Sequence, residues 1–218
     1  MIMRSYTAWL IPAAVMVFGF GPGAARATAQ TITFPFNATY ETALTVEQLT
    51  PDISRALVLG ESTDAPFGLT NLSSSNNYSQ LNPTTNVATF SPDPTDFGLQ
   101  GFPFGSDVLF GSGPNKLFGT SRSTATFDFV NGTVTGSGAI NITDGEGIFT
   151  DATGTLTFTQ NDALNPDPTA PIVGEAILSG SIEAVPEPVS WPGMLVGIGV
   201  IGSGVLLRQR RRHGSTSG

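Results

Sequence analysis

The 218-residue sequence contains no cysteine and a single histidine, His213, close to its C-terminus. Without cysteine the chain forms no disulfide scaffold, no iron–sulfur cluster and no thiolate nucleophile. Without an earlier histidine, the body of the protein holds neither a Ser-His-Asp triad nor a histidine zinc site. Lys116 is the only lysine, and its surroundings lack the spacing of a phosphate-binding loop. We therefore predict a body that is not an enzyme and that takes no cofactor and no metal.

Positive charge is scarce in the middle of the sequence. Residues 30–184 hold three basic and 16 acidic side chains, a net charge of −13, whereas four of the nine basic residues follow Leu207. Binding to phosphates requires clustered lysine and arginine, so the sequence predicts no nucleic-acid partner.

The first 29 residues resemble a secretory signal peptide in their order of features. Arg4 is followed by the apolar residues 8–20 and then by Ala-Thr-Ala at positions 27–29, a small-x-small cleavage site. We predict export and cleavage before Gln30. The alternative is a retained N-terminal anchor.

A second apolar segment, residues 191–207, lies near the C-terminus and carries no charge. As a helix its 17 residues would reach about 26 Å, slightly less than the roughly 30 Å of a bilayer's hydrocarbon core. The basic residues that follow it are typical of a stop-transfer signal: Arg208, Arg210, Arg211 and Arg212. The sequence thus predicts one short transmembrane helix with the body outside the cytoplasm.

The segment 185–213 resembles the PEP-CTERM sorting signal, because a Val-Pro-Glu-Pro motif, a short span and an arginine cluster follow one another in that order. The resemblance implies export in a Gram-negative bacterium that makes exopolysaccharide. It further implies that an exosortase-type membrane protease recognises Pro186, Glu187 and Pro188, processes the tail and releases the body to the outer surface or extracellular matrix. Two prolines favour the extended backbone that a protease needs. The alternative is a permanent single-pass anchor.

Residues 30–184 show the two-residue alternation of strands and no sustained helical period. We predict an all-β ectodomain, a single antiparallel β-barrel or β-sandwich, flanked by a signal-peptide helix and a transmembrane helix. Residues 32–40 place Ile32, Phe34, Phe36, Ala38 and Tyr40 on one face. Further buried positions are expected at Ala125, Phe127, Phe129, Leu156, Phe158, Ile177 and Ile182.

Turn signals divide this body. Asn131-Gly132 favours a type I′ hairpin, and Gly136 and Gly138 then allow a bulge or a close approach of strands. Residues 63–105 are rich in Pro, Asn, Ser and Gly, so we expect long loops there, with short strands near residues 87–90 and 107–110. Long loops in compact domains are often functional. Asp64–Tyr78 is accordingly the candidate binding surface, with a plain surface loop as the alternative.

Residues 145–154, Gly-Glu-Gly-Ile-Phe-Thr-Asp-Ala-Thr-Gly, resemble a turn of allene oxide cyclase-like barrels. The resemblance implies that the glycines form a hairpin and that the phenylalanine plugs the barrel, and it implies no cyclase activity. Asp144, Glu146 and Asp151 are the candidates for carboxylate catalysis, and Asp144 and Glu146 for a calcium site. Ordinary turn acids are the alternative for all three.

These observations favour a non-catalytic surface or matrix protein delivered by its tail, with an exosortase-type protease, the membrane and exopolysaccharide as expected partners. The alternatives are a β-barrel that binds carbohydrate or a small apolar molecule, and a carboxylate-based enzyme.

Overall fold

The computed structural model describes residues 30–165, 167 and 170–185, and these residues form an all-β domain. Both predicted terminal helices, the predicted signal peptide and the sorting signal lie outside the described residues. Within the described part of the chain, nine strands follow one another: β1 (Ile32–Gln48), β2 (Ile53–Glu61), β3 (Asn71–Asn82), β4 (Val87–Ser91), β5 (Ser106–Phe110), β6 (Lys116–Asp128), β7 (Thr133–Glu146), β8 (Thr153–Ala163) and β9 (Ile172–Ala184). The predicted strands near residues 87–90 and 107–110 are thereby confirmed as β4 and β5.

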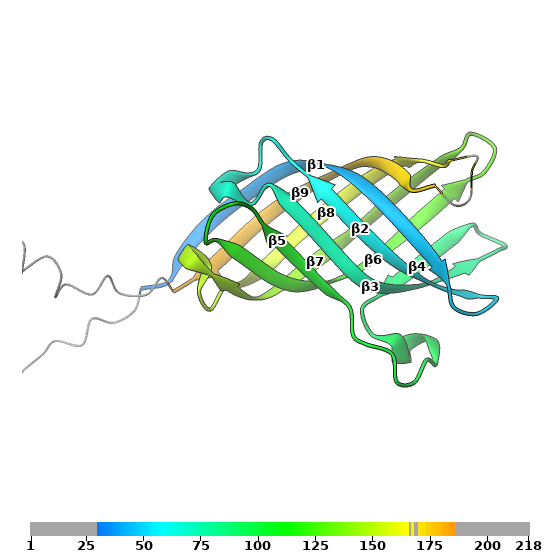
Figure 1. Cartoon of the computed structure of the whole chain (residues 1–218), viewed down its shortest axis with the longest axis horizontal. Helices are drawn as coiled ribbons and strands as arrows, with labels where there is room; N and C mark the ends of the chain where they lie inside the picture. Colours follow the sequence, from blue (N-terminus) through cyan, green and yellow to red (C-terminus); the bar gives the residue numbers. More distant parts are fainter. Residues whose placement is uncertain (1–29, 166, 168–169, 186–218) are drawn as a thin grey trace, which may run out of the picture.

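The strands form one antiparallel sheet in the order β2-β1-β9-β8-β7-β6-β4-β3-β5. Because β2 also pairs with β3, the sheet closes on itself and makes a barrel (Figure 1). The strands β4 and β5 share one position, since each pairs with β3 on one side and with β6 on the other. Of the two architectures that alternation leaves open, the pairing selects the barrel.

Alternation of side chains along each strand divides the interior from the exterior. On β1 the even-numbered Phe36, Ala38 and Tyr40 are buried inside the barrel, as predicted. Leu156 on β8 is also fully buried. Successive residues of a strand point to opposite faces, so a two-residue pattern is what a closed barrel in water requires.

Two buried positions were predicted wrongly. Ile177 is 43% exposed, because it lies five residues before the buried Ile182 and therefore on the opposite face of β9. Phe129 is 58% exposed because β6 ends at Asp128, and its ring stacks on Phe127.

The hairpin near Asn131-Gly132 is confirmed, but its predicted turn type is wrong. A type I′ turn needs positive φ at both central residues, whereas only Gly132 has a positive φ, of 67°. Four residues connect β6 to β7, and the Asp128 carboxylate accepts hydrogen bonds from the backbone amides of Val130 and Asn131.

The prediction of long loops over residues 63–105 is wrong for its central part, which forms the 12-residue strand β3. Its alternation is hidden because Ser74, Asn77 and Ser79 face the interior of the barrel in a strand that is polar on both faces. A true excursion follows at residues 92–105 and contains the short helix η2 (Pro94–Phe97), which projects at the bottom of Figure 1. Tyr78 anchors it by donating a hydrogen bond of 2.6 Å to the carbonyl of Pro103.

One end of the barrel, which we call the closed end, is filled by aromatic rings. The short helices η1 (Pro66–Gly68) and η3 (Gly147–Phe149) lie there. Phe34, Phe67 and Phe149 meet edge to face with ring centroids 5.2–5.6 Å apart. Phe149 is completely buried, so the expectation that this phenylalanine plugs the barrel is confirmed. At the opposite or open end, the interior-facing Val46 and Leu81 are 49% and 38% exposed.

Candidate functional site

The candidate residues named from the sequence do not form a site among the described residues. Glu146 forms an ion pair of 2.7 Å with Lys116 at the surface, and Asp144 and Asp151 are exposed. No group of three or more His, Cys, Asp or Glu side chains in the described part of the chain could hold a metal ion. Pro186, Glu187, Pro188 and the four arginines Arg208, Arg210, Arg211 and Arg212 lie outside the described residues.

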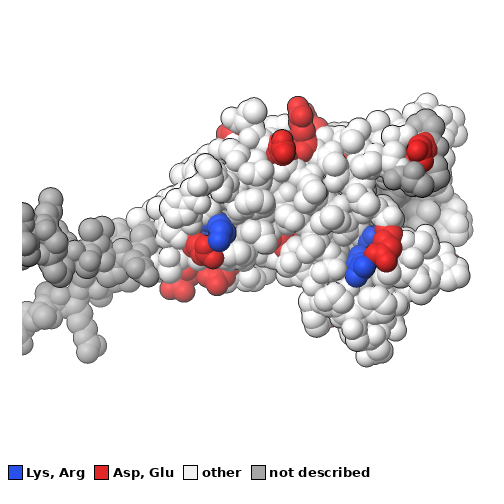
Figure 2. Space-filling model, viewed as in Figure 1, with Lys and Arg blue, Asp and Glu red and all other residues white. Residues whose placement is uncertain are grey.

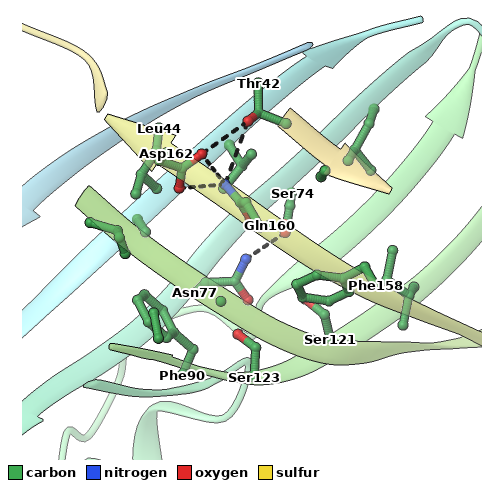
Figure 3. A pocket seen from close by; sticks show the side chains of 18 of the residues that line it. Thr42, Leu44, Ser74, Asn77, Phe90, Ser121, Ser123, Phe158, Gln160 and Asp162 are labelled. Carbon is green, nitrogen blue, oxygen red and sulfur yellow. Dashed lines mark hydrogen bonds between the residues drawn. The ribbon is translucent and has the colours of Figure 1, made fainter. Parts of the chain in front are cut away.

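The barrel itself encloses a cavity of about 80 Å³ on the open side of the aromatic plug. Its lining comes from all nine strands and combines apolar with polar side chains (Figure 3). The polar and charged lining residues are Thr42, Ser74, Asn77, Asp107, Ser121, Ser123, Thr124, Gln160 and Asp162. Two of them, Ser74 and Asn77, belong to the predicted binding segment Asp64–Tyr78, but they lie on a strand that faces inward, not on a surface loop.

The cavity exists because small side chains occupy interior positions that large ones fill near the plug. Ala56, Ala125, Gly136 and Ala176 all line it. A Cβ atom added at Gly136 would meet its nearest neighbours at 3.6–3.7 Å, which is ordinary contact. Two residues further along β7, a Cβ atom at Gly138 would lie 2.4 Å from the Arg122 carbonyl and 2.8 Å from the Phe158 ring. The space therefore opens between these two glycines.

Asp107 is the most unusual residue of the lining. It is only 1% exposed, and its Oδ1 accepts a hydrogen bond from the Ser74 hydroxyl, which in turn accepts one from the Asn77 amide. Its Oδ2 is buried without a hydrogen-bond partner among the described residues, although Ser121 lies nearby. Burial raises the pKa of the Asp107 carboxyl to about 6, against the opposing effect of the Ser74 and Ser121 hydroxyls. A buried polar atom without a partner is rare and costly.

The second carboxylate of the lining, Asp162, is well supplied with donors. Gln160 donates to both of its oxygens at 3.0 and 2.9 Å, and Thr42 donates to Oδ1 at 3.4 Å (Figure 3). Thr42 and Asp162 flank Gly174 on β9, where a Cβ atom would lie 2.1 Å from Asp162 Oδ1. Glycine at 174 thus lets the two side chains meet across the intervening strand. Burial raises the pKa of Asp162, and hydrogen bonds from Gln160 and Thr42 oppose this.

The register along β6 gives the depth of the lining residues. This strand begins at the closed end, where Asn115 donates to the Phe67 carbonyl, and runs to the open end. Asp107 pairs with Gly119, Phe90 pairs with Ser123, and Phe127 follows near the end of the strand. The Asp107 carboxylate is therefore deep, and the rings of Phe90 and Phe127 lie nearer the open end.

Sequence reasoning missed both interior carboxylates, although a signal for them exists. Asp107 alternates with the buried Leu109, and Asp162 has the same parity as the inward-facing Leu156. An acid at an interior position of a strand is the pattern that would have identified them.

The exterior is acidic with few cations. Each of the three basic side chains in the described part is paired: Arg55 with Glu47, Lys116 with Glu146 and Arg122 with Asp96. On the face in Figure 2, basic side chains lie against acidic ones. Among the described residues, no helix has the length and apolar character needed to cross a membrane.

No family model matches the chain, and comparison with curated proteins and with solved structures found no match.

Proposed function

We propose that this protein is an exported binding protein whose barrel holds a small amphipathic ligand in its interior. The observation that carries the proposal is the cavity with the buried, partnerless oxygen of Asp107. Ligand pockets in proteins typically combine an apolar lining with a few convergent polar groups, and the mouth of a β-barrel is a common place for them. The lining of this cavity has both components.

Two carboxylates in one cavity are also typical of glycoside hydrolases, in which paired acids flank the bond that breaks. The volume argues against it. About 80 Å³ is roughly half of the 150 Å³ cavity that encloses one benzene molecule, so two sugar rings do not fit around a scissile bond. Binding of a narrow ligand, or of one end of a longer one, agrees better with the space.

Delivery to the cell surface is the second part of the proposal, and it rests on the sequence of the two ends. An apolar segment after Arg4, a Pro-Glu-Pro motif and a terminal arginine cluster support export and processing by an exosortase-type protease. The acidic body supports a soluble destination and disfavours nucleic acid. Exopolysaccharide of the matrix is the expected surrounding.

Binding is tested with 1-hexanol, a narrow neutral probe, and the purified full chain. Saturation-transfer NMR should show transfer from the protein to the alkyl chain. Gly136→Leu should abolish the signal, because its side chain enters the cavity, whereas Thr135→Leu places the same side chain on the exterior of the same strand and should not. Ala125→Leu is a second filling variant, and circular dichroism checks that each variant is folded. Equal transfer in the filled and unfilled proteins would overturn interior binding.

Delivery is tested by mass spectrometry of both ends of the surface-exposed protein, with and without the candidate protease gene. We expect the N-terminus to lie at Gln30 in both strains. Residues Arg208–Arg212 should be lost only in the strain that has the protease. A surface protein that retains these arginines in both strains would instead be a permanently anchored one.

A further inference from the structure

The charges of the cavity restrict the chemistry of its ligand. Among the described residues that line the cavity, Asp107 and Asp162 are the only ionisable side chains, and none is a lysine, arginine or histidine that would balance their charge. An anionic ligand would therefore enter a cavity that already holds negative charge, whereas a cation would be attracted to both carboxylates.

The hydrogen bonds distinguish the two carboxylates. Both oxygens of Asp162 accept bonds from Gln160, and Oδ1 also accepts from Thr42, so protein donors already support its charge. Asp107 has one bonded oxygen, and its Oδ2 makes no hydrogen bond within the described part of the chain, although the Ser121 hydroxyl lies nearby. A ligand that brings a donor to Oδ2 removes a cost that the free protein bears.

The ligand's orientation follows from depth. The Asp107 carboxylate lies deeper in the barrel than Phe90 and Phe127, which line the cavity toward the open end. A ligand that satisfies both must carry its donor at the leading end and an apolar chain behind it. A divalent metal would need several oxygen ligands, and no such cluster exists among the described residues.

From this geometry we propose that the ligand carries a protonated primary amine that binds Asp107, with an unbranched apolar chain directed along Phe90 and Phe127 toward the open end. The proposal rests on the interior binding proposed above and specifies its chemical class. An ammonium group is compact and supplies three donors, so it can bond Oδ2 and the neighbouring Ser121 hydroxyl at once. The volume of about 80 Å³ admits such a head group and the first part of an unbranched chain, whose remainder extends toward the open end, but it does not admit a bulky ring system.

Three probes of equal chain length test the proposal with the full chain at pH 7.5: n-hexylamine, 1-hexanol and hexanoate. Calorimetric titration should give about tenfold tighter binding of the amine than of the alcohol, since a charge-assisted hydrogen bond to a buried carboxylate is worth at least that factor. Hexanoate should bind least.

Asp107→Asn should remove the preference and leave amine and alcohol bound with similar affinity. The matched control is Glu41→Gln, which removes one negative charge from the exterior of β1 and should leave the preference intact. Gly136→Leu should abolish binding of all three probes.

The outcomes separate this proposal from the one on which it rests. If the alcohol binds inside the barrel but the amine binds no better, or if Asp107→Asn keeps the preference, the amine proposal fails and interior binding stands. If Glu41→Gln loses the preference as fully as Asp107→Asn, the attraction is general electrostatics and the assignment to Asp107 fails. If none of the probes binds, the cavity holds only water and both proposals fall.

Discussion

The two ends of the barrel interior are built by the same strands and yet differ in composition and density. At the closed end, Phe34, Phe67 and Phe149 pack edge to face, and Tyr40, 0% exposed, donates to the Leu69 carbonyl at 2.6 Å. Toward the open end, the same alternating positions carry serine, alanine and glycine around a cavity with two carboxylates. The strands are common to both ends, so the difference lies in the size and polarity of the interior side chains and in the helices η1 and η3, which bring Phe67 and Phe149 into the closed end.

This contrast indicates a division of labour within one small domain. Dense apolar packing supplies most of the folding free energy, because it buries large side chains without voids. A cavity and a partnerless carboxylate oxygen both lower stability, and proteins generally retain such features where function requires them. Substitutions at the two ends should therefore differ in their effects on stability.

The largest effect is expected from Phe149→Ala, which removes the plug of the closed end. Replacing a buried phenylalanine by alanine typically costs about 3–5 kcal/mol, and here both edge-to-face contacts are lost as well. Urea unfolding followed by circular dichroism measures the change. Phe129→Ala is the control at the open end, where the ring is 58% exposed, and it should change the free energy of unfolding by less than about 1 kcal/mol. Similar losses in the two variants would contradict the division between the ends.

A smaller effect of opposite sign is expected from Asp107→Asn at the cavity. The folded-state pKa of about 6 lies above the ordinary value of 3.8, so the folded protein holds a proton that the unfolded chain releases between these values. The favourable contribution is fully present below about pH 3.8 and is lost as the pH rises through 6, which amounts to about 3 kcal/mol. Asparagine carries no charge and should therefore be the more stable form at pH 7.5.

Urea titrations of the wild-type protein and of Asp107→Asn at pH 4, 5, 6 and 7.5 test this prediction. The difference between their free energies of unfolding isolates the contribution of Asp107, because all other acids are common to both proteins. The advantage of the variant should shrink as the pH falls and should disappear near pH 4. A difference that is the same at all four values would mean that the charge of Asp107 does not limit stability.

A strand of this barrel can be predicted from the sequence where neighbouring residues differ clearly in polarity. The strand with Phe36, Ala38 and Tyr40 was predictable because large apolar and polar residues alternate along it. The strand β3 was not, because its residues are polar on both faces and its alternation is interrupted. A register shift lies between Ser74 and Asn77, so both face the cavity although they are three residues apart. A two-residue pattern disappears when the interior itself is polar.

The cavity was beyond prediction for a different reason. Its lining joins Thr42 to Asp162 and Ser74 to Asp107, pairs that are 120 and 33 residues apart in the chain. Barrel closure and strand register bring them together, and neither can be derived from local alternation. Asp107 lies two residues before the buried Leu109, which marks the acid as interior. Only the side-chain contacts of the folded barrel show that its Oδ2 makes no hydrogen bond among the described residues.

The smallest changes in the free energy of unfolding are expected at Gly136 and Gly138, which are neighbours on the interior face of β7. Gly138→Ala should destabilise the protein by about 1–3 kcal/mol, because its Cβ would approach the Arg122 carbonyl and the Phe158 ring too closely. Gly136→Ala should be neutral or should stabilise by up to about 1 kcal/mol, because the methyl group makes ordinary van der Waals contacts at 3.6–3.7 Å and alanine restricts the unfolded chain. Both glycines lack a positive φ, so backbone strain does not separate them. The free energies of unfolding of Gly136→Ala and Gly138→Ala, measured with urea, therefore show which of the two positions borders the cavity. Equal losses at the two positions would mean that the space beside Gly136 is not available, which would remove the physical basis of the proposed binding site.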